Sequence, residues 1–345
     1  MPPLDPAVAT VRLAVRRAPL PPPGALVLVA CSGGPDSMAL ASAAAFALPR
    51  RGLRVGLVTV DHQLQEGSAE RAQGVARWAT SRGLDPVQVC TVDTRGRTGG
   101  PEAAARDARY EALIAAAHDH GAAAVLLGHT REDQAETVLL ALVRGAGPRG
   151  LSGMPVQRRR EGVILLRPLL DVPRAATRDA CLAEDLPVWH DPHNADPAYR
   201  RTHARALLSS LVESLGPAVV GNLARTASLL AADTAVLDRL ARRAARRAST
   251  PDGGLAVAAL AELPEAVRSR VLHRWAAGLG ASRSALSARH VRALDALVTA
   301  WRGQGAVGLP GGIEVVRRRG VLLPVDDRIR HASGRQAARG EEQGP

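Results

Sequence analysis

The sequence predicts an α/β protein built on a doubly wound parallel sheet, followed by a second, smaller and mostly α-helical domain. In the first part of the chain, apolar runs as long as a buried strand alternate with helical stretches, which is the pattern of strand-helix-strand units. Strands covered on both faces read as continuous apolar runs, as Ala25 to Ala30 does. Beyond Gly216 the alternation gives way to alanine- and leucine-rich helical sequence.

The expected strands are the four apolar runs 25–30, 55–60, 87–92 and 123–127. The helices expected in this part of the chain are 38–47, 68–81, 101–120, 173–185 and about 200–215. The helix expected over 101–120 has Pro101 in its first turn and Gly121 directly after its last turn, and these two residues mark its bounds. Distal helices are expected at 219–248, 263–277 and 288–301, and a hairpin at 312–325 around three arginines.

A chain of 345 residues has the length of two domains of about 100–200 residues each. We expect an amino-terminal extension over 1–23, a catalytic α/β domain over 24–215 and a basic helical domain with a terminal hairpin over 216–331. A flexible tail is expected over 332–345. The distal domain carries eighteen arginines against nine carboxylates, so most of the excess positive charge of the chain lies there.

The net charge is +12, and every one of the 45 basic residues is arginine. The absence of lysine excludes a Walker-type phosphate loop and any lysine Schiff base, since both need an amine. Guanidinium groups bind phosphate oxygens in pairs, so the excess suggests a polyanionic partner such as nucleic acid. A genome rich in G and C explains the choice of arginine over lysine, but not the excess.

Three cysteines, Cys31, Cys90 and Cys181, are scattered and form neither a Cys-x-x-Cys pair nor a disulfide framework. They predict a reducing compartment. Cys31 and Cys90 lie in apolar strands and are expected to be small buried hydrophobes. No signal-peptide core and no apolar run of about 20 residues is present, so we expect a cytoplasmic protein outside the membrane.

A glycine-rich hexapeptide directly follows the first expected strand and leads into a helix; it reads Ser32-Gly33-Gly34-Pro35-Asp36-Ser37. Paired glycines allow backbone N–H groups to converge on phosphate oxygens, and the helix amino terminus adds positive charge. The two serine hydroxyls are further donors. A carboxylate inside such a loop repels phosphate unless a cation lies between them, so Asp36 suggests Mg²⁺.

A second polar segment, 128–137, follows the fourth expected strand. Asp133 and Glu136 lie three residues apart at a helix start, so both carboxylates face the same way and could hold Mg²⁺ or receive the ammonium of an amino acid. The alternative is a capped, solvated first turn. His129 ends the strand at the edge where ligands bind, as a nucleotide contact or a structural hydrogen bonder. Arg106 and Arg109 lie one turn apart and could neutralise phosphate charge or only serve solubility.

These motifs together resemble the PP-loop ATP pyrophosphatases, and within them the tRNA(Ile)-lysidine synthases. The hexapeptide at 32–37 is similar to the ATP-binding loop of these enzymes, Val60-Asp61-His62 to their second strand end, and residues 102–110 to their Glu-x-x-Ala-Arg-x-x-Arg-Tyr helix. The segments 128–137, 144–154, 167–170 and 191–194 follow in the expected order. The resemblance spans about residues 24 to 215.

The resemblance implies an ATP-dependent carbon-nitrogen ligase that uses Mg²⁺ and joins L-lysine to carbon 2 of the wobble cytidine of an isoleucine tRNA with a CAU anticodon. The resemblance assigns a role to each of the following residues. Catalysis is implied for Asp36, Arg106, Asp133 and Glu136, and nucleotide binding for Ser32, Gly33, Gly34, Pro35, Asp36, Ser37, Asp61 and His129. Binding of Mg²⁺ is implied for Asp36 and Asp133, and contact with the tRNA substrate for Arg109, Arg201 and Arg205. The family follows its Asp-x-x-Asn loop with Arg-Asn-x-x-Arg, whereas Thr202 stands here in place of the asparagine.

Other functions remain open at this point. tRNA thiolation is a second PP-loop activity, but it needs sulfur-carrying cysteines, and no Cys-x-x-Cys pair is present. Amide synthesis fed by glutamine needs a glutaminase domain for which the length leaves no room. A catalytically dead tRNA-binding protein is a third reading. The arginine runs 242–247 and 317–319 are expected to bind tRNA phosphates or to form solvated surface. A homodimer is compatible with the sequence.

Overall fold

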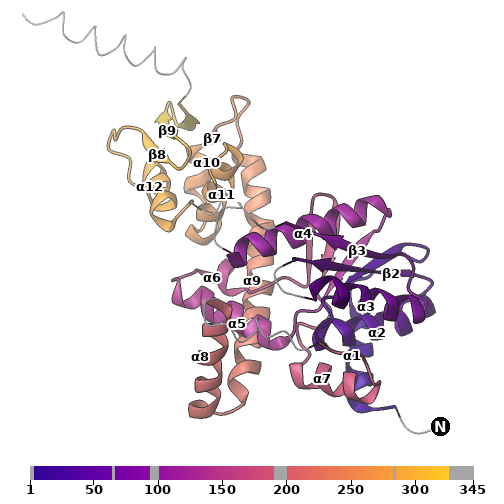
Figure 1. The fold of residues 1–345 in the computed structure, drawn as a ribbon. Coiled ribbons are helices and arrows are strands. Elements are labelled where there is room, and N and C mark those ends of the chain that lie inside the picture. Colours follow the sequence, from indigo (N-terminus) through magenta and orange to yellow (C-terminus); the bar gives the residue numbers. More distant parts are fainter. Residues whose placement is uncertain (1–3, 64–66, 94–100, 190–199, 283–284, 326–345) are drawn as a thin grey trace, which may run out of the picture. The chain divides into compact units, whose positions relative to one another are not determined.

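The computed structural model describes residues 4–63, 67–93, 101–189, 200–282 and 285–325, with the backbone alone at 101–103, 200 and 201 (Figure 1). The chain divides into two compact units between Ala231 and Ala232, inside the long helix α9 (Ala218–Ala248). The domain bounds expected from the sequence, with a change after residue 215, stay a prediction. Each unit has its own hydrophobic core.

The first unit is built on a six-stranded sheet in the order β3-β2-β1-β4-β6-β5. The strands are β1 (Leu26–Ala30), β2 (Arg54–Asp61), β3 (Val87–Thr91), β4 (Ala124–Leu127), β5 (Gln157–Arg160) and β6 (Val163–Leu166). Every neighbouring pair is parallel except β5 and β6, which are antiparallel. Because the chain proceeds from β1 to β2 on one side and β4 lies on the other, the strand order reverses between β1 and β4, where open α/β sheets bind their ligands.

Helices cover both faces of this sheet, as the apolar runs predict. Val27 and Val29 of β1 belong to the core on one face, where α1 (Pro6–Arg17), α2 (Pro35–Ala47), α3 (Ser68–Ser81) and α7 (Arg174–Ala183) pack. Leu26 and Leu28 point to the other face, covered by α4 (Pro101–Asp119). The four strands and the helices expected along 25–215 are thereby confirmed to within a few residues.

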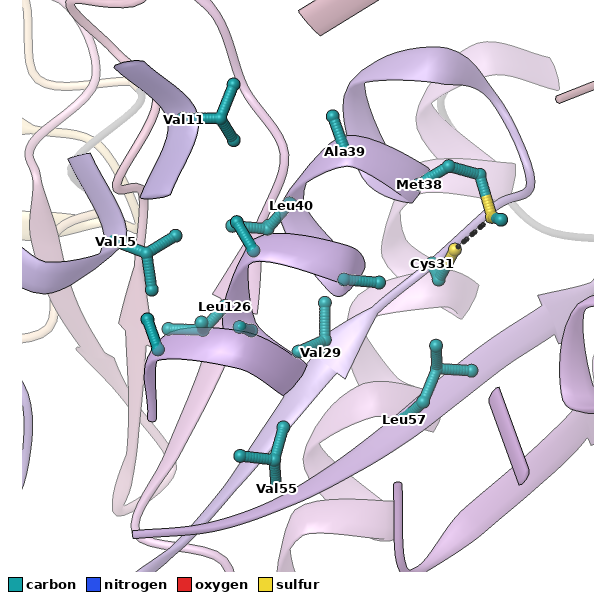
Figure 2. Close-up of a cluster of buried hydrophobic side chains, with 14 of the residues drawn as sticks. Val11, Val15, Val29, Cys31, Met38, Ala39, Leu40, Val55, Leu57 and Leu126 are labelled. Atoms are coloured by element: carbon teal, nitrogen blue, oxygen red, sulfur yellow. Dashed lines mark hydrogen bonds between the residues drawn. The ribbon is translucent and has the colours of Figure 1, made fainter. Parts of the chain in front are cut away.

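Helix α1 lies within the segment that the sequence treats as an extension. The Asp5 carboxylate caps it by accepting from the backbone N–H groups of Ala7 at 2.8 Å and Val8 at 3.4 Å. Val8, Val11 and Val15, spaced three and four apart, are all buried against the core of the first unit. Figure 2 shows Val11 and Val15 within the same cluster as Leu40 of α2. The helix is therefore an integral part of the unit's core.

The remaining elements of the first unit are the 3-10 turn Pro49–Arg51, α5 (Arg131–Val143), α6 (Pro148–Leu151) and α8 (Arg200–Leu215). Among the described helices, none alone is long and apolar enough to cross a membrane; only the bent pair Thr202–Leu215 and Ala218–Ala248 meets the length and composition test when taken together.

The second unit combines helices with a small sheet. Helices α10 (Val257–Ala261), α11 (Glu265–Gly278) and α12 (Ala288–Thr299) pack with the end of α9 around buried Leu260, Val271 and Leu294. The expected hairpin is confirmed as the antiparallel pair β9 (Ile313–Arg318) and β10 (Val321–Pro324). Two short strands that the sequence does not predict, β7 (Leu255–Ala256) and β8 (Val307–Leu309), extend it to four strands.

Because one face of α1 is buried, we expect substitutions on that face to lower the unfolding free energy. Replacing fully buried Val15 by alanine removes two methyl groups from the core and leaves a small cavity, so it should cost about 2 kcal/mol of unfolding free energy. For a unit of this size the thermal midpoint should fall by about 4–8 °C in scanning calorimetry. Leu13→Ala on the exposed face of the same helix is the matched control and should leave the midpoint nearly unchanged. Equal midpoints for the two variants would show that α1 does not stabilise the core.

Candidate active site

A cleft of about 510 Å³ opens at the carboxyl ends of β1, β2 and β4. Ala30, Val60 and Leu127, at or next to the last residue of these three strands, line its apolar part. Its polar part is lined by the loop after β1, the start of α5 and the start of α7. The cleft therefore lies at the reversal of strand order, where the fold leaves room for a ligand.

The loop from Ser32 to Ser37 is held in shape by its own hydrogen bonds. The Ser37 hydroxyl accepts from the Ser32 backbone N–H at 3.1 Å and donates to the Gly34 carbonyl at 2.9 Å. Gly33 has φ +84°, a conformation that side chains rarely adopt, and Pro35 opens helix α2 after Gly34. The loop thus leads directly into the amino terminus of a buried helix, which is the arrangement that binds phosphate.

Gly128 allows the end of β4 to approach this loop closely. A Cβ atom at Gly128 would lie 3.2 Å from the backbone of Asp36 and Ser37, which is closer than nine in ten Cβ contacts in proteins. The glycine that opens the segment 128–137 is therefore explained by packing against the start of α2. As a result, the first turns of α2 and α5 lie next to each other at the cleft.

Three carboxylates from these two helices converge on one guanidinium group, that of Arg174 at the start of α7. Arg174 contacts Asp133 Oδ1 at 2.8 Å, Asp36 Oδ2 at 3.4 Å and Glu136 Oε1 at 3.7 Å. Arg205 of α8 adds a second guanidinium, 2.8 Å from Glu136 Oε1 and 3.8 Å from Asp133 Oδ1. Below, the acidic cluster means the carboxylates of Asp36, Asp133 and Glu136, and its two arginines are Arg174 and Arg205.

Both carboxylates of α5 are largely shielded from water. Asp133 forms a capping box, because its Oδ2 accepts from the backbone N–H of Thr130 at 2.8 Å and from the Thr130 hydroxyl at 3.1 Å. The Glu136 side chain is only 3% exposed. The turn is thus capped, as one reading of the sequence proposes, but its Glu136 is not solvated. A charge buried to this degree needs partners, and the arginines supply them.

The pKa values of the three carboxyl groups diverge. Burial raises the pKa of Asp36 above its usual value, although the Thr177 hydroxyl and Arg174 oppose the shift. Burial likewise raises the pKa of Glu136 against the attraction of Arg205. At Asp133 burial acts in the same direction, but Arg174, then His129, outweigh it and hold the pKa below its usual value. Asp133 is therefore the most firmly ionised of the three.

Some of the other residues singled out from the sequence line the cleft, and some do not. His129 and Arg109 line the cleft, together with His62, whose pKa is lowered by burial and then by Arg109. Arg106 is not among the described residues that line the cleft; its guanidinium lies 5.6 Å from the centre of the Tyr110 ring.

Asp61 also lies outside the described lining of the cleft. It is buried at the end of β2 and accepts from the Gln63 backbone N–H at 2.9 Å. The side chain of Arg201 and the segment 191–194 lie outside the residues that the structure describes. Among the described residues, no three His, Cys, Asp or Glu side chains form a group that could hold a metal ion by themselves.

Sequence reasoning missed the contribution of α7. Its Arg174 and Thr177 contact Asp36, Arg178 lines the cleft, and Cys181 donates to the Pro35 carbonyl at 3.2 Å. These residues recur at the three- and four-residue spacing of one helix face, so the stripe was visible in the sequence. Nothing in the sequence, however, indicates that this stripe faces the loop after β1. Trp189, whose backbone N–H donates to the Gly33 carbonyl at 2.9 Å, was missed as well.

Comparison with known proteins defines the class to which this fold and cleft belong. Residues 12–211 match the family model of the PP-loop domain, and the chain belongs to this family of ATP-using enzymes. Residues 255–323 match the model described as the TilS substrate binding domain. A U34-tRNA thiolase from Methanococcus maripaludis has the same fold, with a TM-score of 0.55 over 65% of this chain and 80% of that one, at 14% identity.

Closer relatives narrow the family. The tRNA(Ile)-lysidine synthase of Salinispora tropica is 63% identical over 94% of this chain and 98% of its own length. Those of Streptomyces coelicolor and Thermobifida fusca are 56% and 53% identical over 93% and 92% of this chain, and 98% and 97% of their own lengths. The chain belongs to the tRNA(Ile)-lysidine synthases and is an ATP-dependent ligase.

The divergent pKa values predict opposite effects of two matched substitutions on the nucleotide-free protein. Because the pKa of Asp36 is raised on folding, its ionisation costs the folded state stability as pH rises through that pKa, and Asp36→Asn should raise the thermal midpoint at pH 7. Because the pKa of Asp133 is lowered, its ionisation stabilises the folded state, and Asp133→Asn should lower the midpoint at pH 7.

The Asp36 difference should shrink as pH falls through the raised pKa toward the ordinary aspartate pKa of about 3.9. The Asp133 difference should persist down to about that pH and shrink only below it, as pH falls through the lowered pKa. Thermal unfolding of the two variants and the parent, followed from pH 7 to about one unit below the ordinary aspartate pKa, measures this. Shifts of the same sign at pH 7 contradict the assignment of the two carboxyl groups.

Proposed function

We propose that the cleft ligates L-lysine to carbon 2 of the cytidine at the wobble position of an isoleucine tRNA with a CAU anticodon. The observation that carries the proposal is the convergence of a phosphate-type loop, Ser32 to Ser37, and a buried acidic cluster on one cleft. One part suits the polyphosphate of ATP, and the other suits cations. The close relatives named above are similar over nearly their whole lengths, which supports the same reaction.

The reaction has two steps. In the first, cytosine O2 attacks the α-phosphorus of ATP, the bond to the β-phosphate oxygen breaks, and pyrophosphate leaves. In the second, the side-chain amine of lysine attacks carbon 2, the carbon–oxygen bond breaks, AMP leaves with that oxygen, and the amine releases a proton. Adenylation thus turns a poor leaving group into a good one.

The loop after β1 is proposed to hold the two phosphates that leave. Gly33 and Gly34 keep side chains away from the ligand, while the amino terminus of α2 presents N–H groups and the positive end of the helix dipole. Ser32 Oγ lies 3.3 Å from Ser37 Oγ, so both hydroxyls are on the same side of the loop. The developing charge of pyrophosphate would be stabilised without rearranging the backbone.

Asp36 and Asp133 fit the requirements of Mg²⁺. This ion is typically bound by one or two carboxylates together with substrate phosphates and water, so the two residues need no third protein ligand. Both already share a cationic partner, Arg174, which shows that one positive group reaches both carboxylates. When bound, the ion would offset the charge of the departing pyrophosphate.

Glu136 is proposed to receive an ammonium group of lysine, because its carboxylate shares a helix face with that of Asp133 and is shielded from water. Arg109 is proposed to neutralise phosphate charge from within the cleft. Arg106 is proposed to act with it from beside Tyr110. Arg201 and Arg205 remain proposed tRNA contacts, and Arg205 is also a partner of Glu136. His129 is proposed to contact the nucleotide, and Asp61 to do so from the end of β2.

The second unit offers a basic surface for tRNA. On α9, Arg242, Arg243, Arg246 and Arg247 are exposed, whereas the alanines between and beside them face the core of the unit. Arg317 of the hairpin instead donates to the Leu297 carbonyl at 2.9 Å and lies 5.3 Å from the Trp301 ring. We therefore assign the phosphate contacts to the exposed arginines on α9. The proposed partner is tRNA in the cytoplasm, and the proposed assembly is a homodimer.

Thiolation and a dead PP-loop protein remain the competing functions. The likeness to the tRNA thiolase concerns the fold alone, and the sequence contains no Cys-x-x-Cys pair to carry sulfur. A dead protein would release no AMP. Incubating the protein with ATP, tRNA and one labelled amino acid at a time separates all three functions, since only the ligase incorporates lysine and releases AMP.

Asp36→Ala should abolish the tRNA-dependent exchange of pyrophosphate into ATP, with a decrease of about a hundredfold or more, because the first step no longer has its proposed cation ligand. Asp179→Ala, at an exposed position of α7, is the matched control and should exchange at the parent rate. Unaltered exchange by the Asp36 variant would remove this carboxylate from the mechanism.

The double variant Arg242→Gln/Arg246→Gln should bind tRNA more weakly, and the dependence of log affinity on log salt should become shallower by about one for each phosphate that the variant no longer neutralises. Affinity for ATP should not change. Arg289→Gln/Arg292→Gln removes the same charge from two exposed positions of α12 and should keep the parent slope. Identical slopes for all three proteins would place the tRNA elsewhere.

A further inference from the structure

Arg174 occupies the centre of the acidic cluster. Its guanidinium group is the single cation that contacts Asp36, Asp133 and Glu136 together in the described part of the chain. The Arg174 side chain is 18% exposed, so few water molecules compete with it for these carboxylates. The position between two carboxylates of different helices is the one that a bound cation must take to bridge them.

Within the described part of the chain, the charge of the cluster is not balanced by its arginines. Three carboxylates there contact two guanidinium groups, and a fourth carboxylate, that of Glu132, accepts from the Arg174 backbone N–H at 2.8 Å. Arginine stays protonated at any physiological pH, so Arg174 always contributes its charge. Were its guanidinium to leave, the described contacts of Arg205 would still reach Asp133 and Glu136 but not Asp36, and the excess of negative charge would favour a divalent ion.

The contacts of Arg174 are also of unequal strength. Only the contact to Asp133, at 2.8 Å, has the length of a strong charged hydrogen bond, whereas those to Asp36 at 3.4 Å and Glu136 at 3.7 Å are weaker. The backbone of Arg174 is held separately by Glu132. The flexible side chain can therefore move to a new partner while the helix start stays in place.

A triphosphate in the loop after β1 would be such a partner. Asp36 lies within that loop, and Arg174 already touches it, so phosphates bound there come within reach of the guanidinium. Phosphate oxygens pair with arginine in the same two-pronged manner as carboxylates do. The nucleotide and the acidic cluster thus compete for one side chain.

We propose that Arg174 fills the cation position between Asp36 and Asp133 in the nucleotide-free protein, and that the triphosphate draws it away so that the divalent ion enters only with the nucleotide. The proposal rests on the function proposed above, with Arg174 as a positioning residue. It predicts an order of binding, because metal alone finds its place taken by an arginine. A purely structural ion pair would leave the metal affinity of the nucleotide-free protein unchanged when Arg174 loses its charge.

The test is the binding of Mn²⁺ to the full-length protein, measured by the decrease of the free-ion signal in electron paramagnetic resonance. The parent protein should bind Mn²⁺ weakly alone and at least about tenfold more tightly with α,β-methylene ATP, once the ligand's own metal affinity is subtracted. Arg174→Gln should bind Mn²⁺ at least about tenfold more tightly than the parent without any nucleotide, because one opposing charge is gone. Adding Asp133→Asn to it should abolish that gain.

Two controls separate this effect from charge and folding. Arg178→Gln removes the same charge from the next turn of α7, beside the cleft, and should bind Mn²⁺ without nucleotide as the parent does. Arg174→Lys keeps a positive charge and should restore most of the exclusion. Circular dichroism establishes that each variant is folded. If Arg174→Gln fails to fold, the linkage in the parent protein decides, and equal Mn²⁺ affinity with and without the analogue overturns the proposal.

The proposal is also overturned if Arg174→Gln binds Mn²⁺ no better than the parent, or if Arg178→Gln gains as much. Incorporation of labelled lysine into tRNA by the parent protein is measured in parallel. Absence of incorporation with the Mn²⁺ pattern intact refutes the ligase function but leaves Arg174 in its place. Incorporation without the Mn²⁺ pattern refutes only the role of Arg174.

Discussion

The cleft depends on one electrostatic constraint: three carboxylates lie close together, largely shielded from water, at the carboxyl ends of the central strands. Isolated buried charges are unfavourable, so the fold must bring cations to them. It does so from two helices that come late in the chain, with Arg174 on α7 and Arg205 on α8. The acidic cluster therefore connects the first turns of α2 and α5 to the elements that follow the sheet.

This constraint explains several features around the loop. Gly128 lets α2 and α5 approach closely enough for their carboxylates to share a partner. Thr130 caps α5 through Asp133, so that carboxylate is fixed before any ligand arrives. The internal hydrogen bonds of the loop fix Ser37 in the same way. The loop and the acidic cluster thus lie side by side, so under the function proposed above the side chain of Arg174 is the part that has to move when phosphate and cation bind.

Much of the first unit could be predicted from the sequence, because strands buried on both faces leave continuous apolar runs such as Leu26 to Ala30. The loop at 32–37 was also predictable, since its glycines and its place after a strand are local features. Helix α1 was missed because its buried valines stand among polar and charged residues near a proline-rich stretch. Strand β5 was missed because three of its four residues are arginines, as an exposed edge strand tolerates.

The partners of the candidate site were not predictable from local pattern. Arg174 and Asp36 are separated by 138 positions in the chain, and only the packing of α7 against α2 brings them together. The sequence indicated that Asp133 and Glu136 share a helix face, but not that one arginine would span both and Asp36 as well. Local spacing reports the face of an element, whereas the partner of that face depends on the tertiary fold.

The most direct test is a crystal structure of the protein with α,β-methylene ATP and Mn²⁺, with the metal located by its anomalous scattering. We expect the β- and γ-phosphates on the loop from Ser32 to Ser37, the metal between them and Asp36 and Asp133, and Arg174 turned toward phosphate. A nucleotide bound elsewhere, with this loop empty and Arg174 still among the three carboxylates, would contradict the proposed roles of the loop and of Arg174.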